Sequence, residues 1–129
     1  MENMTWFDSL NKPFLNPPDW LFTPVWTALY ILMGLSLVFF LSSGMNKSKI
    51  LPLIFFVTQL VLNLAWSPVF FGAQNILGAL VIIVFMWLFT VLTINSFLKH
   101  SKLAAALLIP YLIWISFAFY LNFGFYVLN

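Results

Sequence analysis

Uncharged polar side chains recur at helical spacing in one of the hydrophobic stretches of this sequence, next to a large aromatic residue. Gln59, Asn63 and Ser67 follow one another at intervals of four, so a helix through them places all three on one face. Trp66 borders that face. Amides beside an indole suit the binding of a flat, mainly apolar molecule, because ring systems stack on tryptophan and a few polar groups fix the orientation.

Two further hydrophobic stretches carry related stripes of aromatic and small residues. Trp26 and Tyr30 are four residues apart, and Gly34 continues their face. The stripe near the end of the chain consists of Tyr111, Trp114 and Ala118, with Ser116 and Asn122 nearby. Three such faces turned toward one another would form an aromatic pocket.

The same residues also fit a purely structural interpretation. An amide surrounded by hydrocarbon must find its hydrogen-bond partner within the protein, so Gln59 and Asn63 would equally well join neighbouring helices. The spacing alone leaves the pocket and the interhelical contact as alternatives. Trp87 is offset from any polar partner, and we expect it to face lipid or to pack. Trp20 is expected in an interfacial aromatic belt.

Residues for acid–base, nucleophilic or metal chemistry are scarce. The single histidine, His100, lies among lysines and is expected to be a solvated loop residue, far from Glu2, Asp8 and Asp19 near the start. The chain has no cysteine, which excludes thiolate chemistry and cysteine–metal sites. We therefore predict no catalytic residue, no metal ligand and no cofactor, and we do not expect an enzyme.

Composition assigns the chain to the membrane. Of its 129 residues, 64% are hydrophobic and only 6% are charged, whereas a soluble domain carries about 25% charged residues. Five basic and three acidic residues give a net charge of +2, and five basic residues are too few for a nucleic-acid-binding face. The length allows one domain, so we predict a single integral membrane domain over residues 1–129.

Four hydrophobic segments approach the roughly 20 residues that a helix needs to cross a bilayer. The sequence therefore predicts an all-α bundle with helices at about 24–43, 49–71, 75–98 and 102–127. Expected N-caps are Thr23 (followed by Pro24), Ser48, Asn75 and Ser101. Pro68 and Pro110 should kink their helices, because each removes a backbone donor.

The lysines indicate an orientation. Lys47 and Lys49 lie between the first two predicted helices, and Lys99 and Lys102 between the last two, while the middle turn has none. The positive-inside rule makes those two loops cytoplasmic. Residues 1–23, rich in tryptophan and proline, and the C-terminus would then share the opposite face, where we expect residues 1–23 to form a lid loop.

Several blocks of this sequence resemble the TspO/translocator protein family, also called the tryptophan-rich sensory protein or peripheral-type benzodiazepine receptor family. The blocks are WFDSLNKPFLNPPDW at residues 6–20, PVWTALY at 24–30, NLAWSPVFFG at 63–72 and PYLIW at 110–114. The match runs through essentially the whole chain, the blocks occur in the family's order, and the combination is highly specific.

The resemblance implies a five-helix bundle, commonly a homodimer, that binds porphyrins, cholesterol or isoquinoline-type ligands beneath the first long loop. The resemblance thus implies three partners: a porphyrin or another apolar small molecule, membrane lipid, and a second copy of the chain. No nucleic acid is expected. The porphyrin would be a ligand rather than a cofactor. Ligand-binding roles carried over by motif fall on Trp6, Trp26, Tyr30, Asn63, Trp66, Trp114 and Ala118.

Three departures from the family pattern stand out. The family has a transmembrane helix before the tryptophan-rich loop, so either the start is placed too far downstream or this is a four-helix variant. Phe7 replaces the usual tyrosine and loses a phenolic hydroxyl. Tyr126 lacks the following basic residue of the sterol-recognition pattern, which favours porphyrin over sterol.

The expected function is that of a membrane receptor or transport-related protein that binds porphyrin-type tetrapyrroles in a sensory or regulatory role. Asn63 would bond a polar edge of the ring, and Lys12 in the lid loop would meet a carboxylate or simply be solvated. The alternative is a light-dependent porphyrin-degrading enzyme, with radicals on Trp6 and Trp114. A small multidrug exporter is disfavoured, because no carboxylate lies within the predicted helices.

Overall fold

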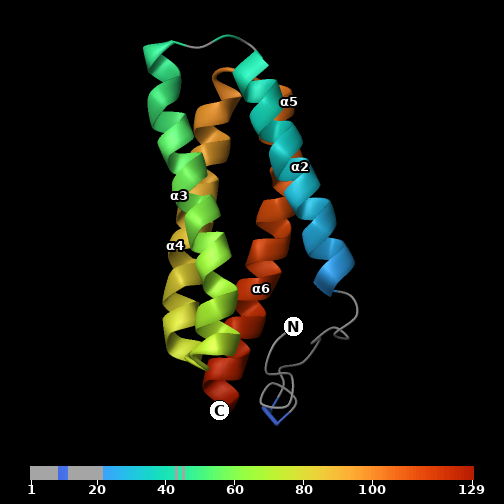
Figure 1. Ribbon diagram of the computed structural model, residues 1–129, viewed down its shortest axis with the longest axis vertical. Coiled ribbons are helices and arrows are strands. Elements are labelled where there is room, and N and C mark those ends of the chain that lie inside the picture. The colour runs from blue at the N-terminus through green and yellow to red at the C-terminus, as the bar shows by residue number, and fades with distance from the viewer. Residues whose placement is uncertain (1–8, 12–21, 43, 45) are drawn as a thin grey trace.

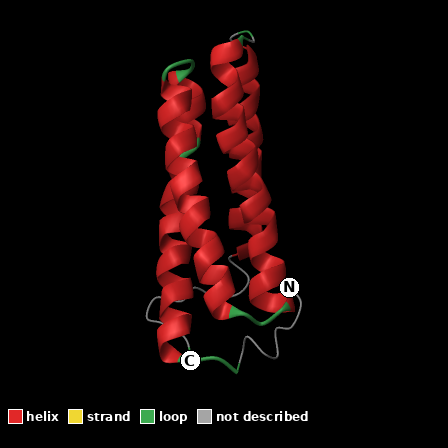
Figure 2. Cartoon of the chain, turned by 90° about the vertical axis from the view of Figure 1, so that its left-hand side faces the viewer, coloured by secondary structure: helices red, strands yellow, loops and turns green. Residues whose placement is uncertain are grey.

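The computed structural model describes residues 9–11, 22–42, 44 and 46–129, and in these ranges every regular element is a helix (Figures 1 and 2). The elements in chain order are α2 (Phe22–Ser42), the short 3-10 helix η2 (Lys47–Lys49), α3 (Ile50–Ser67), the π-helical turn η3 (Pro68–Gly72), α4 (Ile76–Leu98), α5 (Lys102–Leu107) and α6 (Ile109–Leu128). The all-α prediction is confirmed.

Four stretches of the described chain are long and apolar enough to cross a membrane: Pro24–Ser42, Lys47–Gly72, Ile76–Leu98 and Lys102–Leu128. Each coincides with one of the four predicted segments. Many large apolar side chains on them face outward, among them Ile113 with 65% exposure. Such a surface suits lipid rather than water, so the bundle has the character of an integral membrane protein.

The helices alternate in direction, and α4 lies at the centre of their contacts. It packs against α3, α5 and α6, while α2 packs chiefly against α5. Figure 1 shows the α2–α3 connection and the α4–α5 turn at one end of the bundle, with the C-terminus at the other. The two connections that carry lysines therefore share one end, as expected for a bundle whose helices alternate in direction.

Two of the predicted helix caps are confirmed and two are wrong. The Asn75 side chain accepts from the Gly78 N–H at 2.9 Å, and the Ser101 side chain accepts from the Ala104 N–H at 3.2 Å. Ser48 does not cap α3; its own N–H donates to Asn46, which caps η2 instead. Thr23 does not precede its helix, because α2 already begins at Phe22.

Both prolines interrupt regular α-helix, as predicted. At Pro68 the chain widens into η3, where the Ala73 N–H reaches back five residues to the Pro68 carbonyl at 2.9 Å. Near Pro110 the last span divides at Leu108 into α5 and α6. A missing N–H is accommodated by a wider turn in one case and by a break in the other.

Stacked aromatic rings form the core at the end of the bundle that carries the lysines. Phe40 stacks on Phe97 with ring centroids 4.0 Å apart, and Phe97 stacks on Phe56 at 6.0 Å. Lys49 is buried there, with Nζ donating to the Phe40 carbonyl at 2.7 Å. His100 lies in the turn before α5, as expected, and is half-buried with its ring edge-on to Phe40 at 5.5 Å.

Candidate functional site

A chain of hydrogen bonds crosses the inside of the bundle and joins α2, α3 and α6. The Tyr30 hydroxyl on α2 donates to Asn63 Oδ1 on α3. Asn63 Nδ2 donates to the Tyr111 hydroxyl on α6 at 2.7 Å, and that hydroxyl donates onward to Gln59 Oε1 at 2.8 Å. Gln59 Nε2 donates to Met33 Sδ, back on α2, at 3.5 Å. The polar groups thus form a loop that begins and ends on α2.

Helical spacing explains why this loop closes. Gln59 and Asn63 are four residues apart on α3 and Tyr30 and Met33 three apart on α2, so each pair presents neighbouring side chains on one face. Tyr111 enters between the two amides and is fully buried. Because each amide oxygen and the central hydroxyl have partners, the cost of placing them in an apolar interior is largely offset.

An aromatic cluster adjoins this polar loop at Tyr30. The Trp26 ring lies 6.0 Å from the Tyr30 ring and 6.3 Å from the Trp114 ring, to which it is nearly perpendicular at 89°. Trp114 in turn contacts Phe117 at 5.5 Å. Trp26 and Trp114 are both half-buried, so α2 and α6 present two indoles at right angles beside the hydrogen-bonded tyrosine.

Trp66 takes a different position from the other predicted binding residues. Its Nε1 donates to Asn122 Oδ1 at 2.9 Å, and Asn122 Nδ2 donates to the Ile76 carbonyl at 3.1 Å. Its ring packs against Phe70 and Phe71, 5.1 Å and 6.1 Å away. Trp66 thereby links α3 to α6 near η3, at the edge of a second apolar cluster.

The structure brings together Trp26, Tyr30, Asn63 and Trp114, and it buries Ala118 in the same core cluster. Trp6 and Lys12 lie outside the described residues. Gly34 and Ser67, which end the predicted stripes, are exposed. Sequence reasoning placed Tyr111 on the right face yet did not assign it the central position that it holds.

Trp87 departs from its prediction in one respect. It is exposed on α4, as expected for a residue facing lipid, but its Nε1 donates to the Ser116 hydroxyl on α6 at 2.9 Å. Ser116 therefore turns away from the internal stripe with which the sequence grouped it. Its partner lies on another helix, and spacing within one helix cannot reveal such a pair.

The arrangement is suited to binding rather than to proton transfer. Neutral amides, phenols and indoles line it, and such groups orient a ligand by hydrogen bonds and ring contacts. Among the described residues, no three histidine, cysteine or acidic side chains gather closely enough to hold a metal ion. Asn63 retains a second N–H beyond the one that Tyr111 accepts, so it has hydrogen-bonding capacity left.

Four membrane-length helices around a hydrogen-bonded aromatic centre define a multi-pass integral membrane protein. The chain belongs to the TspO/MBR family, whose model matches residues 1–128. It is 50% identical over 125 residues to the tryptophan-rich protein TspO of Chlorobaculum tepidum, covering 96% of this chain and 79% of that one. It is 48% identical over 126 residues to the protein of the same name from Archaeoglobus fulgidus (97% and 80%).

More distant relatives carry names that refer to sensing and translocation. The tryptophan-rich sensory protein of Cereibacter sphaeroides is 41% identical over 118 residues, which cover 92% of this chain and 73% of that protein. The human translocator protein is 39% identical over 124 residues, covering 95% and 73%. The similarity thus extends from bacteria and archaea to mammals, over nearly the whole of this chain.

Proposed function

We propose that this protein is a membrane receptor, with a sensory or transport-related role, that binds porphyrin-type tetrapyrroles at the aromatic site between α2, α3 and α6. Membership of the family and the sensory and translocator names of the relatives support the role. The choice of a tetrapyrrole as ligand rests on the pair of half-buried indoles, Trp26 and Trp114, next to the Tyr30–Asn63 hydrogen bond.

The geometry of the two indoles fits a large flat ring better than a flexible chain. Since their planes are nearly perpendicular, a planar ligand can stack on one ring while the other meets its edge, the two favourable aromatic arrangements. Asn63 has an unused N–H within the same site, which can donate to a polar group at the edge of the ring. Tyr30 is 39% exposed and can adjust to a ligand more readily than buried Tyr111.

The orientation and assembly belong to the same proposal. The end that carries Lys47, Lys49, Lys99 and Lys102 faces the cytoplasm, in line with the positive-inside rule. Ligand would then approach from the opposite end, toward which the N-terminal half of α2 extends (Figure 1); this half includes Trp26. The working unit is a homodimer in contact with membrane lipid, and it binds no nucleic acid.

The experiment is a titration of the purified protein in detergent with protoporphyrin IX, followed by the Soret absorbance of the porphyrin. Absorbance is preferable to tryptophan fluorescence, because the test variants remove tryptophans. Trp26→Ala and Trp114→Ala should each weaken binding about 30-fold, since a central aromatic contact contributes about 2 kcal/mol. Phe85→Ala removes an exposed aromatic ring on α4 and should leave the affinity unchanged.

Circular dichroism separates loss of binding from loss of fold, because both tryptophan variants should keep the helical content of the parent. A parallel titration with a sterol should give weaker binding than protoporphyrin. Equal affinity for protoporphyrin in the parent and in both tryptophan variants would remove this site from consideration.

A further inference from the structure

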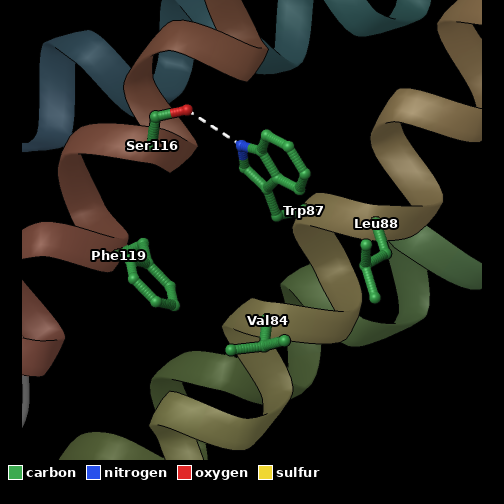
Figure 3. A pocket seen from close by; sticks show the side chains of 5 residues that line it. All are labelled: Val84, Trp87, Leu88, Ser116 and Phe119. Atoms are coloured by element: carbon green, nitrogen blue, oxygen red, sulfur yellow. Dashed lines mark hydrogen bonds between the residues drawn. The ribbon is translucent and has the colours of Figure 1, made fainter.

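A groove lies on the outer surface of the bundle, between α4 and α6 and away from the site described above. Val84, Trp87 and Leu88 line it from α4, and Ser116 and Phe119 line it from α6 (Figure 3). Its volume is about 490 Å³, within the range of about 300–1,000 Å³ that small-molecule sites occupy. The groove is therefore large enough for a small molecule.

Trp87 lies unusually deep in the membrane for an exposed tryptophan. Trp87 is the central residue of the 23-residue α4, so about 16 Å of helix separates it from either end. The hydrocarbon core is about 30 Å thick, so the indole lies near its middle. Exposed tryptophans are normally found at the membrane interfaces, where the N–H can meet water or headgroups. Trp87 instead depends on Ser116 for its hydrogen bond.

The hydrogen bonds of Ser116 leave one position open. Its hydroxyl donates to the Leu112 carbonyl at 2.9 Å and accepts from Trp87 Nε1 at 2.9 Å. A hydroxyl oxygen has two lone pairs, so a second acceptor position remains at a residue that lines the groove. In hydrocarbon, a molecule gains by occupying it only if it brings its own hydrogen-bond donor, and a hydroxyl group supplies one.

The aromatic residues of the groove complement this polar position. Figure 3 shows the Trp87 side chain reaching from α4 toward Ser116, with the Phe119 ring on the same side of α6. Phe119 is three residues beyond Ser116, close to one helical turn. A ring placed between the indole and the phenyl group would contact both while its hydroxyl meets Ser116.

We propose that this groove is a second ligand site, which takes from the lipid phase an apolar ring molecule bearing one hydroxyl group. The ligand O–H donates to Ser116 Oγ, and its ring lies against Trp87 and Phe119. Lipid acyl chains compete for the groove but cannot make the hydrogen bond. The site does not depend on the tetrapyrrole site between α2, α3 and α6.

The test uses a matched pair of photoreactive probes on the full chain in liposomes. One is 4-(trifluoromethyldiazirinyl)benzyl alcohol, and the other is the corresponding toluene, which differs only by the hydroxyl. After irradiation, mass spectrometry of peptides locates the labelled residues. The alcohol should label the groove residues about fivefold more than the toluene, the factor expected for one net hydrogen bond.

Three variants identify the cause. Ser116→Ala removes the acceptor and should bring the alcohol-to-toluene ratio to about one. Ser42→Ala removes another exposed hydroxyl that bonds a backbone carbonyl of its own helix, and the ratio at the groove should not change. Trp87→Leu leaves the acceptor but removes the indole, so labelling by both probes should fall.

Equal labelling of the groove by the two probes in the parent protein would overturn the proposal, since the groove would then hold hydrocarbon without selection. So would a ratio that survives in Ser116→Ala. Labelling that disappears when the chain associates, and returns when it is monomeric, would instead assign the groove to a second copy and would also overturn it.

Discussion

Asn63 and Tyr111, 48 residues apart in sequence, join α3 to α6 through a hydrogen bond of 2.7 Å deep inside the bundle. The bond connects the two interpretations that the sequence left open for Asn63. In this structure the amide serves as an interhelical contact, and it also accepts from Tyr30, whose ring adjoins the Trp26 indole of the candidate site. The polar loop therefore holds three helices in the positions that bring the aromatic residues together.

The hydroxyl of Tyr111 should contribute measurably to stability. Tyr111→Phe removes the acceptor for Asn63 and the donor to Gln59, so two buried amide groups lose a partner. Single interhelical hydrogen bonds in membranes contribute about 0.6 kcal/mol on average, and unsatisfied buried groups add to the loss. We expect the free energy of unfolding, measured by SDS titration in mixed micelles, to fall by about 1–2 kcal/mol.

A matched control lies on the same helix. Tyr126→Phe makes the same chemical change at an exposed position, and the free energy of unfolding should change by less than about 0.5 kcal/mol. Tyr30→Phe should fall between the two, because it leaves only Asn63 Oδ1 without its donor. Similar losses for all three variants would mean that the internal loop has no special structural role.

Lys49 provides a second test of a contact that spacing could not reveal. Its buried ammonium group donates to the Phe40 carbonyl in the last turn of α2 and lies 4.8 Å from the centre of the Phe40 ring. Lys49→Met keeps much of the side-chain volume but loses the charge and the donor. The same SDS titration should show a loss of about 1.5–3 kcal/mol, the contribution of a charged hydrogen bond.

Lys47→Met is the control for that variant, because Lys47 is exposed two residues away. Its effect should stay within about 0.5 kcal/mol. If Lys47→Met destabilised the protein as much as Lys49→Met, the cause would be general loss of positive charge at this end rather than the Phe40 contact.

A reciprocal pair of asparagines attaches the described part of the N-terminal segment to the end of α6. The Asn11 N–H donates to Asn129 Oδ1 at 3.0 Å, and Asn129 Nδ2 donates to the Asn11 carbonyl at 3.0 Å. Asn129→Ala removes both bonds. Hydrogen exchange at the Asn11 amide, followed by NMR, should therefore accelerate about tenfold, since each bond contributes about 1 kcal/mol or less.

Asn95→Ala, an exposed asparagine on α4, should leave exchange at Asn11 unchanged. Unchanged exchange in Asn129→Ala would show that this attachment is not maintained by the side chain of Asn129. In that case the bond from Asn11 Nδ2 to the Leu128 carbonyl at 3.2 Å and the contact of Leu10 with the apolar cluster around Phe70 and Phe125 would be the main anchors.

The sequence predicted the helical bundle well, because the signal for a membrane helix is a local property of about 20 residues. Helix ends were less accurate. Asn75 and Ser101 cap their helices as predicted, whereas Asn46, two residues before Ser48, takes the cap position by forming η2. A short 3-10 turn and an α-helical start use the same residue types, so local sequence does not separate them.

The faces of the internal site could be predicted from spacing, but their partners could not. The stripe through Gln59 and Asn63 is buried, and Tyr111 was on the expected face of its helix. That Trp66 binds Asn122 and Trp87 binds Ser116 depends on how neighbouring helices are rotated relative to one another. This rotation is set by packing over the whole bundle, which periodicity within one helix does not contain.

The central claim, that Trp26 and Trp114 form one tetrapyrrole site, is tested most directly by a double-mutant cycle on protoporphyrin affinity. The parent, Trp26→Ala, Trp114→Ala and the double variant are compared by Soret titration in detergent. Each single variant should weaken binding about 30-fold, and the double variant should weaken it by clearly less than the product, because contacting residues couple by about 0.5–3 kcal/mol. Unchanged affinity in both single variants would contradict the claim.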